Sequence, residues 1–290
     1  HQDITDFTDH LARRRWLYRT LGIPRLAFRG ASVLEIGPGT GDNGLAYPYL
    51  GVSKVTFIEG NAASVAAVRD KNAQGLYVDV PVQIVESDFN AVDGSSNAFD
   101  IVICEGVIPG QDDPFRSVRK VLDFAAPGGV VVMTATCYTS MLAEILRRAM
   151  RFWQCSASDP FDEQTARLAR FFAPDLASLP GMKRLPADWV LDNIQFPFPR
   201  NMVFPLHNHL EAVGDDAVVL GTSPAMTLDW RWYKQIDRAS EKRNDRAAAA
   251  VALLQPHLID YRIDRFSARI GAVADEIEAL AEDVFHAHFE

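Results

Sequence analysis

Residues 33–41 read Val33-Leu34-Glu35-Ile36-Gly37-Pro38-Gly39-Thr40-Gly41, and this stretch decides the fold. An apolar run enters a turn with three glycines in the spacing GxGxG, and a helical segment follows. Glycine lets the backbone take positive φ and approach a ligand closely. The pattern predicts a strand, a turn that contacts a bound cofactor, and a helix.

The spacing and the charges around this turn distinguish two kinds of ligand. A dinucleotide fingerprint usually reads GxGxxG or GxGxxA, and Asp42 prevents a shift of the third glycine that would restore it. A turn that cradles phosphate should also avoid negative charge, yet Glu35 precedes this turn and Asp42 follows it. These features favour a ligand that carries an ammonium and a sulfonium.

Short apolar runs on either side of the turn extend the pattern. Residues 32–36, 54–59, 82–86, 99–104 and 129–134 are rich in Val and Ile and continuous rather than alternating, which is typical of strands covered on both faces. Helical segments at about 44–49, 62–72 and 114–124 lie between them. The repeated units predict an α/β fold with a doubly wound parallel sheet.

Residues 33–41 resemble motif I of the class I S-adenosylmethionine-dependent methyltransferases. The order of later segments is similar as well: Phe57-Ile58-Glu59-Gly60-Asn61, Glu86-Ser87-Asp88-Phe89, Phe99-Asp100-Ile101-Val102-Ile103-Cys104 and Pro127-Gly128-Gly129. The resemblance covers about residues 31–134 and continues more weakly through residue 236. It implies a Rossmann-like methyltransferase sheet and S-adenosyl-L-methionine as the cofactor.

The resemblance also implies roles for single residues. Glu59 stands where the family has an acid that binds both ribose hydroxyls, and a carboxylate has two oxygens to accept both. Asp88 stands where an acid meets the adenine amino group, and Phe89 packs either on adenine or in the core. The predicted cofactor-binding residues are Glu35, Gly37, Gly39, Gly41, Glu59, Asp88, Phe89 and Glu105.

The segment after the fourth strand departs from the family pattern. Many small-molecule members carry a Glu-His pair where this chain has Pro109-Gly110, and the Asn-Pro-Pro-Tyr signature of amino-methylating nucleic-acid enzymes is absent. Glu105 lies at the carboxyl end of this strand, where open α/β sheets place ligands. It is predicted to contact acceptor or cofactor, with a structural role as the alternative.

Two histidines in a predicted helix are further candidates for catalysis. His207 and His209 are two residues apart, so they do not share a helix face, and either could act as a base near neutral pH. Ordinary surface or capping histidines are the alternative reading. A metal site would need a third ligand, and no metal is predicted. The predicted catalytic residues are His207, His209 and Glu105.

The remaining segments extend this core. We expect an N-terminal helical lid over residues 1–30, the cofactor-binding core over 31–137, a helical acceptor cover over 138–216, the last two strands of the sheet within 217–237, and a C-terminal helical extension over 238–290. The two late strands, 217–221 and 228–236, are predicted to be antiparallel.

The C-terminal extension carries a heptad-like repeat. Apolar residues alternate at spacings of four and three: Ile259, Ile263, Phe266, Ile270, Val273, Ile277, Leu280 and Val284. A seam of this kind predicts either a coiled coil that forms a homodimer or a long helix packed on the chain's own core.

Charge and composition limit the partners. The net charge is −9, so a nonspecific nucleic-acid binder is not expected, and the run Arg13-Arg14-Arg15 is interpreted as a solvated helix face. No apolar run approaches the roughly 18–20 residues that cross a bilayer. The three cysteines form no metal-binding spacing or disulfide framework, which favours a reducing cytoplasm.

Together these patterns predict an enzyme, a S-adenosylmethionine-dependent methyltransferase that acts on a small-molecule acceptor, at oxygen rather than nitrogen. Two alternatives remain open. One is a non-catalytic, cofactor-binding scaffold that assembles through its C-terminal helix. The other is a nicotinamide-dependent oxidoreductase on a related fold.

Overall fold

The computed structural model describes residues 4, 6–94, 98–179, 181–227, 229–236, 242–260, 262 and 267–289. These residues form two compact units. The core unit comprises the described residues of Asp6–Ala135 and Phe204–Ala248, and the helical unit comprises those of Thr136–Val203 and 249–289 together with Ile4. Each unit has its own secondary structure and its own buried side chains.

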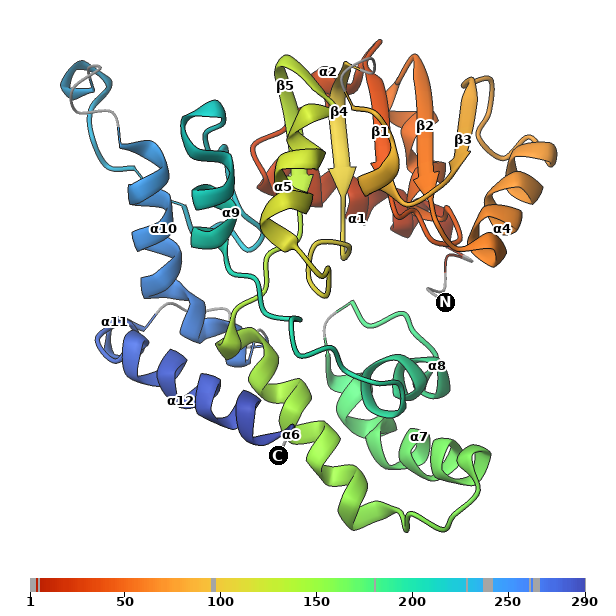
Figure 1. Ribbon diagram of the computed structural model, residues 1–290, viewed down its shortest axis with the longest axis vertical. Coiled ribbons are helices and arrows are strands. Elements are labelled where there is room, and N and C mark those ends of the chain that lie inside the picture. Colours follow the sequence, from red (N-terminus) through yellow and green to blue (C-terminus); the bar gives the residue numbers. More distant parts are fainter. Residues whose placement is uncertain are drawn as a thin grey trace. The chain divides into compact units, whose positions relative to one another are not determined.

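The core unit is built on one five-stranded sheet (Figure 1). The strands are β1 (Ser32–Ile36), β2 (Lys54–Glu59), β3 (Val82–Glu86), β4 (Phe99–Cys104) and β5 (Ala125–Met133). Their order is β3-β2-β1-β4-β5 and all four pairings are parallel. The predicted bounds of β1 to β4 are confirmed, and β5 begins four residues earlier than expected.

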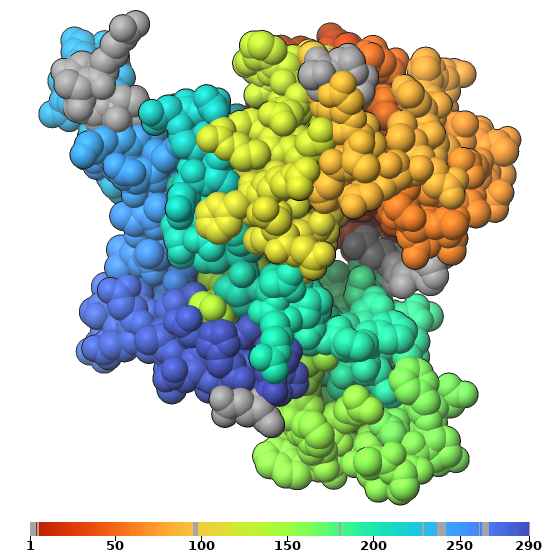
Figure 2. Space-filling view, in the orientation of Figure 1, coloured from red at the N-terminus to blue at the C-terminus, as the bar shows by residue number. Residues whose placement is uncertain are grey.

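Helices cover this sheet as a doubly wound fold requires. α4 (Ala62–Ala73) packs on β2 and β3, and α5 (Pro114–Asp123) packs on β4 and β5. The predicted helix at 44–49 is a 3-10 turn, η1 (Asn43–Ala46), followed by the short α3 (Tyr47–Leu50). The side chains of α5 form much of the visible surface of the core unit in Figure 2.

The N-terminal segment belongs to the core unit. It forms α1 (Phe7–Thr20) and the short α2 (Arg25–Phe28). The side chain of Asp6 caps α1 by accepting a hydrogen bond from the backbone N–H of Asp9 at 3.0 Å. Gly22, with φ of +80°, follows the helix end, where a left-handed residue is common.

The buried strand residues in the hydrophobic core of the sheet come from β1, β2 and β4, and partly buried residues of β3 and β5 pack against them. Leu34, Ile36, Ile58, Val102 and Cys104 are buried together with side chains from α5 and from α9 (Leu206–Val213). Every residue of β1 is buried, which explains why its sequence is continuous rather than alternating. The core therefore fixes the carboxyl end of β1, where the glycine turn begins.

The two antiparallel strands expected within 217–236 are not formed among the described residues, and Leu228 lies outside them. The side chain of Asn244 explains this result for the first of them. Its amide accepts a hydrogen bond from the Val219 N–H at 3.0 Å and donates one to the Ala217 carbonyl at 2.8 Å. These are backbone groups that a neighbouring strand would have used. Residues 233–235 form a 3-10 turn, η5 (Tyr233–Gln235), instead.

The helical unit contains α6 (Tyr138–Gln154), α7 (Phe161–Ser178), α8 (Pro186–Val190) and the π-helical turn η3 (Leu191–Gln195). Its own core includes Leu168, Phe172, Leu176, Trp189 and Ile194. The segment of this unit that begins at Thr136 ends at Val203 rather than at 216, because α9 packs on α5 in the core unit.

The C-terminal extension is not one long helix. It consists of α10 (Arg243–Leu254), η6 (Gln255–Ile259), α11 (Ala268–Gly271) and α12 (Ala274–Ala287). Pro256 lacks the N–H that would continue α10, and His257 Nε2 accepts a hydrogen bond from the Ser267 N–H at 3.0 Å, which turns the chain back. Within the seam itself, Asp260 is extended and α11 ends at Gly271 before α12 begins at Ala274, so one continuous heptad helix is wrong; Ile263 and Phe266 lie outside the described residues.

α12 packs on α6 within the same unit (Figure 1). The Glu278 carboxylate accepts hydrogen bonds from the backbone N–H groups of Tyr138 and Thr139, both at 2.9 Å. The buried residues of α12 are Ala274, Ala281 and Phe285, whereas the seam residues Val273 and Leu280 are exposed. Packing on the chain's own core, the second of the two sequence interpretations, describes this helix.

Candidate active site

The glycine turn leaves the carboxyl end of β1 with three left-handed residues. Gly37, Gly39 and Gly41 have φ of +66°, +56° and +79°, a region that favours glycine. The Gly37 N–H donates to the Ile58 carbonyl at 2.9 Å, which ties the turn to β2. The turn therefore has the backbone conformation that its sequence predicted.

The three glycines differ in the space beside them. A Cβ on Gly37 would lie 2.4 Å from Val107 Cγ2, and one on Gly41 would lie 2.5 Å from the Tyr77 hydroxyl oxygen. A Cβ on Gly39 would meet no atom within 4 Å. Gly37 and Gly41 are thus required by close packing, whereas the turn is open at Gly39.

These spaces predict the effect of a methyl group at each position. We expect Gly41→Ala to lower the free energy of unfolding by about 2 kcal/mol more than Gly30→Ala, because both residues have positive φ but only Gly41 adds a clash. Urea unfolding of the two variants measures this difference. Equal losses would contradict the packing interpretation.

Glu59 links the glycine turn to the end of β2. Its carboxylate accepts a hydrogen bond from the Gly39 N–H at 3.1 Å and another from the Asn61 N–H at 2.8 Å. The open part of the turn and the predicted ribose-binding acid are therefore side by side. The carboxylate is partly exposed and each oxygen can accept a further hydrogen bond.

Asp88 and Phe89 follow β3 at the same edge of the sheet. The Asp88 side chain accepts a hydrogen bond from the Asn90 N–H at 2.9 Å and caps the turn η2 (Phe89–Ala91). Phe89 is buried in the core cluster with Ile58 and Val102. Of its two predicted environments, the structure places the ring in the core.

Glu35 is buried beneath the glycine turn. The Tyr47 hydroxyl donates to its carboxylate at 2.8 Å. Burial raises the pKa of Glu35 to about 7, and the nearby Arg14 and the Tyr47 hydrogen bond oppose this rise. A carboxyl group in this state gains from a cationic ligand, because the cation favours its charged form.

Glu105 follows β4 and forms an ion pair that the sequence interpretation missed. Arg14 Nη1 and Nη2 donate to its two carboxylate oxygens at 2.8 and 2.7 Å. The Arg14 side chain is 8% exposed, so the interpretation of the three arginines as a solvated face is wrong for this one. The signal was present, because Leu11, Arg14 and Tyr18 have the spacing of one buried helix face.

The two histidines of α9 lie in different environments. His207 is exposed, whereas His209 is 4% exposed and packs on the Phe204 ring at 4.7 Å between ring centres. Burial lowers the pKa of His209, and the backbone of Pro205 and Thr134 opposes this. Among the described residues, no group of three or more His, Cys, Asp or Glu side chains is arranged to hold a metal ion.

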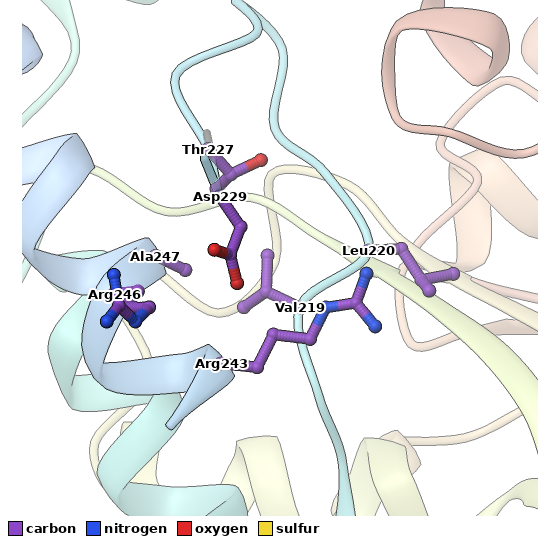
Figure 3. A pocket seen from close by; sticks show the side chains of 7 residues that line it. All are labelled: Val219, Leu220, Thr227, Asp229, Arg243, Arg246 and Ala247. Atoms are coloured by element: carbon purple, nitrogen blue, oxygen red, sulfur yellow. The ribbon is translucent and has the colours of Figure 1, made fainter. Parts of the chain in front are cut away.

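A cavity of about 70 Å³ lies elsewhere in the core unit. Figure 3 shows the Asp229 carboxylate between the side chains of Arg243 and Arg246. The other lining residues are Val219, Leu220, Thr227 and Ala247. The cavity contains none of the predicted site residues and is far smaller than the roughly 300 Å³ or more of a usual ligand pocket. It is therefore not the cofactor site.

The parallel sheet brings the predicted cofactor residues to one edge. The glycine turn follows β1, Glu59 ends β2, Asp88 follows β3 and Glu105 follows β4. A glycine turn at the switch between β1 and β4, where the strand order reverses, defines a Rossmann-like domain that binds a nucleoside-containing cofactor at this edge.

Comparisons with known proteins agree with this class. Residues 34–133 match the family model described as "Methyltransferase domain". The match covers the cofactor-binding core and agrees with the resemblance to the class I S-adenosylmethionine-dependent methyltransferases, whose cofactor is S-adenosylmethionine. The expectation of a S-adenosylmethionine-dependent methyltransferase is confirmed at this level. The match favours a methyltransferase over a nicotinamide-dependent oxidoreductase.

Solved structures share the fold. PKMT2 from Rickettsia typhi in complex with AdoHcy is 16% identical, with a TM-score of 0.55 over 83% of this chain and 50% of that chain. The CcbJ methyltransferase from Streptomyces caelestis is 21% identical, with a TM-score of 0.36 over 46% of this chain and 51% of that one. This chain thus spans about half the length of the solved structures it matches. No curated protein sequence matches it.

No helix among the described residues combines the length and the apolar character needed to cross a membrane.

Proposed function

We propose that this chain transfers a methyl group from S-adenosylmethionine to a small-molecule acceptor, at oxygen rather than nitrogen. The observation that supports S-adenosylmethionine as the cofactor is the hydrogen bond from the Gly39 N–H to the Glu59 carboxylate at 3.1 Å. It joins an open left-handed turn to a carboxylate with free acceptor capacity. Bound there, the cofactor supplies an electrophilic methyl group on a sulfonium.

The residues at the sheet edge fit such a ligand. Glu59 would hold the ribose hydroxyls and Asp88 the adenine amino group, while Gly37, Gly39 and Gly41 keep the backbone close. The buried Glu35 carboxyl, with Glu105 near it, would face the cationic amino-acid end. Phe89, fixed in the core, would support the adenine side from below rather than stack on it.

Several observations support a small acceptor. The net charge of −9 disfavours a nucleic acid, and residues 104–110 lack the signature of amino-methylating nucleic-acid enzymes. The preference for oxygen follows the frequency of O-methylation in the family it resembles. The three cysteines are free, which agrees with the expected reducing cytoplasm.

Catalytic roles for Glu105, His207 and His209 are part of the proposal. Holding the acceptor in line with the methyl group can supply much of the rate, so a base is needed only when the acceptor must lose a proton early. The backbone of Thr134, one residue beyond β5, acts electrostatically on the His209 ring, and this position favours His209 over the exposed His207 as a base.

The pH dependence of the reaction tests these histidines. A base must be neutral, and burial lowers the pKa of His209, so we expect the acid limb of kcat to have its midpoint below pH 6.5. His209→Gln should abolish this limb, and His207→Gln should keep it. Steady-state rates between pH 5 and 9 provide the measurement. A limb that survives in His209→Gln would eliminate this base.

Calorimetric titration with S-adenosylmethionine, followed by mass spectrometry of a panel of hydroxylated and amine acceptors, tests the function as a whole. We expect micromolar binding and methylated products with hydroxyl acceptors. Binding without any product across the panel would favour the non-catalytic scaffold. The scaffold alternative assumed one continuous C-terminal helix, whereas the described part of the tail forms separate elements after α10.

A further inference from the structure

A buried ion pair joins α1 to the carboxyl end of β4. Arg14 Nη1 donates to Glu105 Oε2 and Nη2 to Glu105 Oε1, and Nη2 also donates to the Tyr18 hydroxyl at 2.5 Å. Arg14 Nε is buried without a hydrogen-bond partner among the described residues. The guanidinium is therefore held in a defined orientation by two partners 4 and 91 residues away in sequence.

The same helix lies beside the glycine turn. α1 packs on η1, which directly follows the turn, and the His10 side chain is close to the Asp42 backbone. Phe7 contacts Tyr49 with 5.0 Å between ring centres. α1 thus touches the chain on both sides of the cofactor edge, after β1 and after β4.

Stability alone is a weak explanation for this pair. Removing two charges from water costs free energy, and apolar replacements of buried ion pairs are often as stable as the original. The other two arginines of the run are more exposed: Arg13 forms a 3.8 Å ion pair with Asp9, and Arg15 is exposed. The buried arginine is the one that faces two acids of the proposed site, Glu105 and Glu35.

We propose that Arg14 is a positioning residue of the cofactor site: it holds Glu105 at the end of β4 and keeps α1 docked beside the glycine turn. This inference rests on the proposed function. The guanidinium acts through the two carboxylates rather than by contact with the reacting atoms. Its charge balances one acid and leaves the site with net negative charge for a cationic ligand.

The charges around Glu35 determine how this role can be measured. The groups that face it are Arg14 and Tyr18 from α1, Tyr47 from α3, Tyr77 before β3, and Glu105 after β4. Arg14 lowers the pKa of Glu35, and Glu105 raises it. Loss of Arg14 therefore raises the pKa of Glu35, whereas loss of Glu105 lowers it.

The test is calorimetric titration of the full chain with S-adenosylmethionine between pH 6 and 9, with thermal unfolding of every variant. We expect Arg14→Gln to weaken binding at pH 7 by roughly tenfold, the scale of a lost charge-assisted pair, and to move the pH midpoint of affinity upward. Glu105→Gln should move the midpoint downward. Arg14→Lys should restore the midpoint without the full affinity, because lysine keeps the charge but cannot bind both oxygens as a fork.

Arg15→Gln is the matched control, since it removes an exposed arginine from the next position of the same helix and should change neither affinity nor midpoint. If the pair has only a structural role, Arg14→Gln and Glu105→Gln should both lower the unfolding temperature, and the pH midpoint of affinity should not move in opposite directions. That result would overturn the proposal. If Arg14→Gln does not fold, the proposal is tested by whether the pH midpoint of affinity moves downward in Glu105→Gln. Absence of binding by the unmodified chain would overturn the proposed function as well, whereas normal binding with unchanged midpoints would overturn only the role of Arg14.

Discussion

Replacing Glu59 by Ala is expected to weaken binding of S-adenosylmethionine by roughly 10- to 100-fold, which corresponds to the loss of charge-assisted hydrogen bonds to the ribose. The variant also removes the acceptor of the Gly39 and Asn61 N–H groups, so the glycine turn loses its link to the end of β2. Calorimetric titration of the wild-type and variant proteins gives the two dissociation constants directly.

Glu86 provides the matched control for this experiment. It is paired in register with Glu59 at the end of the neighbouring strand, but its carboxylate forms a surface ion pair with Arg69 at 3.0 Å. Glu86→Ala should therefore change the cofactor affinity by less than a factor of about 2. Equal losses in the two variants would mean that the sheet edge as a whole, rather than Glu59, responds to the substitution.

Replacing Glu35 by Gln is expected to change stability and cofactor binding in opposite directions. The carboxyl of Glu35 has its pKa raised from 4.5 to about 7 by burial, so the folded protein keeps this proton to higher pH than the unfolded chain does. Its contribution to stability is full below pH 4.5 and is lost as the pH rises through about 7. The loss amounts to about 3 kcal/mol as an upper limit.

The Gln variant removes this titration and retains an acceptor for the Tyr47 hydroxyl. Relative to wild type, we expect its free energy of unfolding to increase between pH 5 and 8, measured by urea unfolding. Its affinity for S-adenosylmethionine at pH 8 should fall, because a neutral amide does not attract the cationic end of the cofactor. Wild-type affinity should rise with pH through about 7 for the same reason.

Asp100→Asn serves as a control, because the pKa of Asp100 is shifted in the opposite direction to that of Glu35. Hydrogen bonds from the Ser32 N–H and hydroxyl hold the pKa of Asp100 below its usual value, so its stabilisation is present above pH 3.8 and is lost as the pH falls through the folded pKa. The difference in free energy of unfolding between Asp100→Asn and wild type should thus be constant from pH 5 to 8. If the difference in free energy of unfolding between Glu35→Gln and wild type is also constant over this pH range, Glu35 does not titrate there and the prediction is wrong.

The sequence by itself determined the sheet and the turn. β1 to β4 are continuous apolar runs, and such runs specify strands buried on both faces whatever the rest of the chain does. The positive φ of Gly37, Gly39 and Gly41 follows equally from local sterics. Parallel strands then place Glu59, Asp88 and Glu105 at one edge, so the order of the motifs predicted which residues meet there.

Only the tertiary structure decided features that depend on distant partners. Arg14 is buried because Glu105, 91 residues away, neutralises it; the spacing of Leu11, Arg14 and Tyr18 indicates a buried helix face, but only the tertiary structure supplies the partner. Residues 217–221 form no strand because Asn244 takes their backbone hydrogen bonds. The C-terminal heptads lack a continuous helix because the chain leaves the helix at Asp260 and again between α11 and α12, and α12 buries Ala274, Ala281 and Phe285 instead. In each case a long-range contact outweighs a weak local preference.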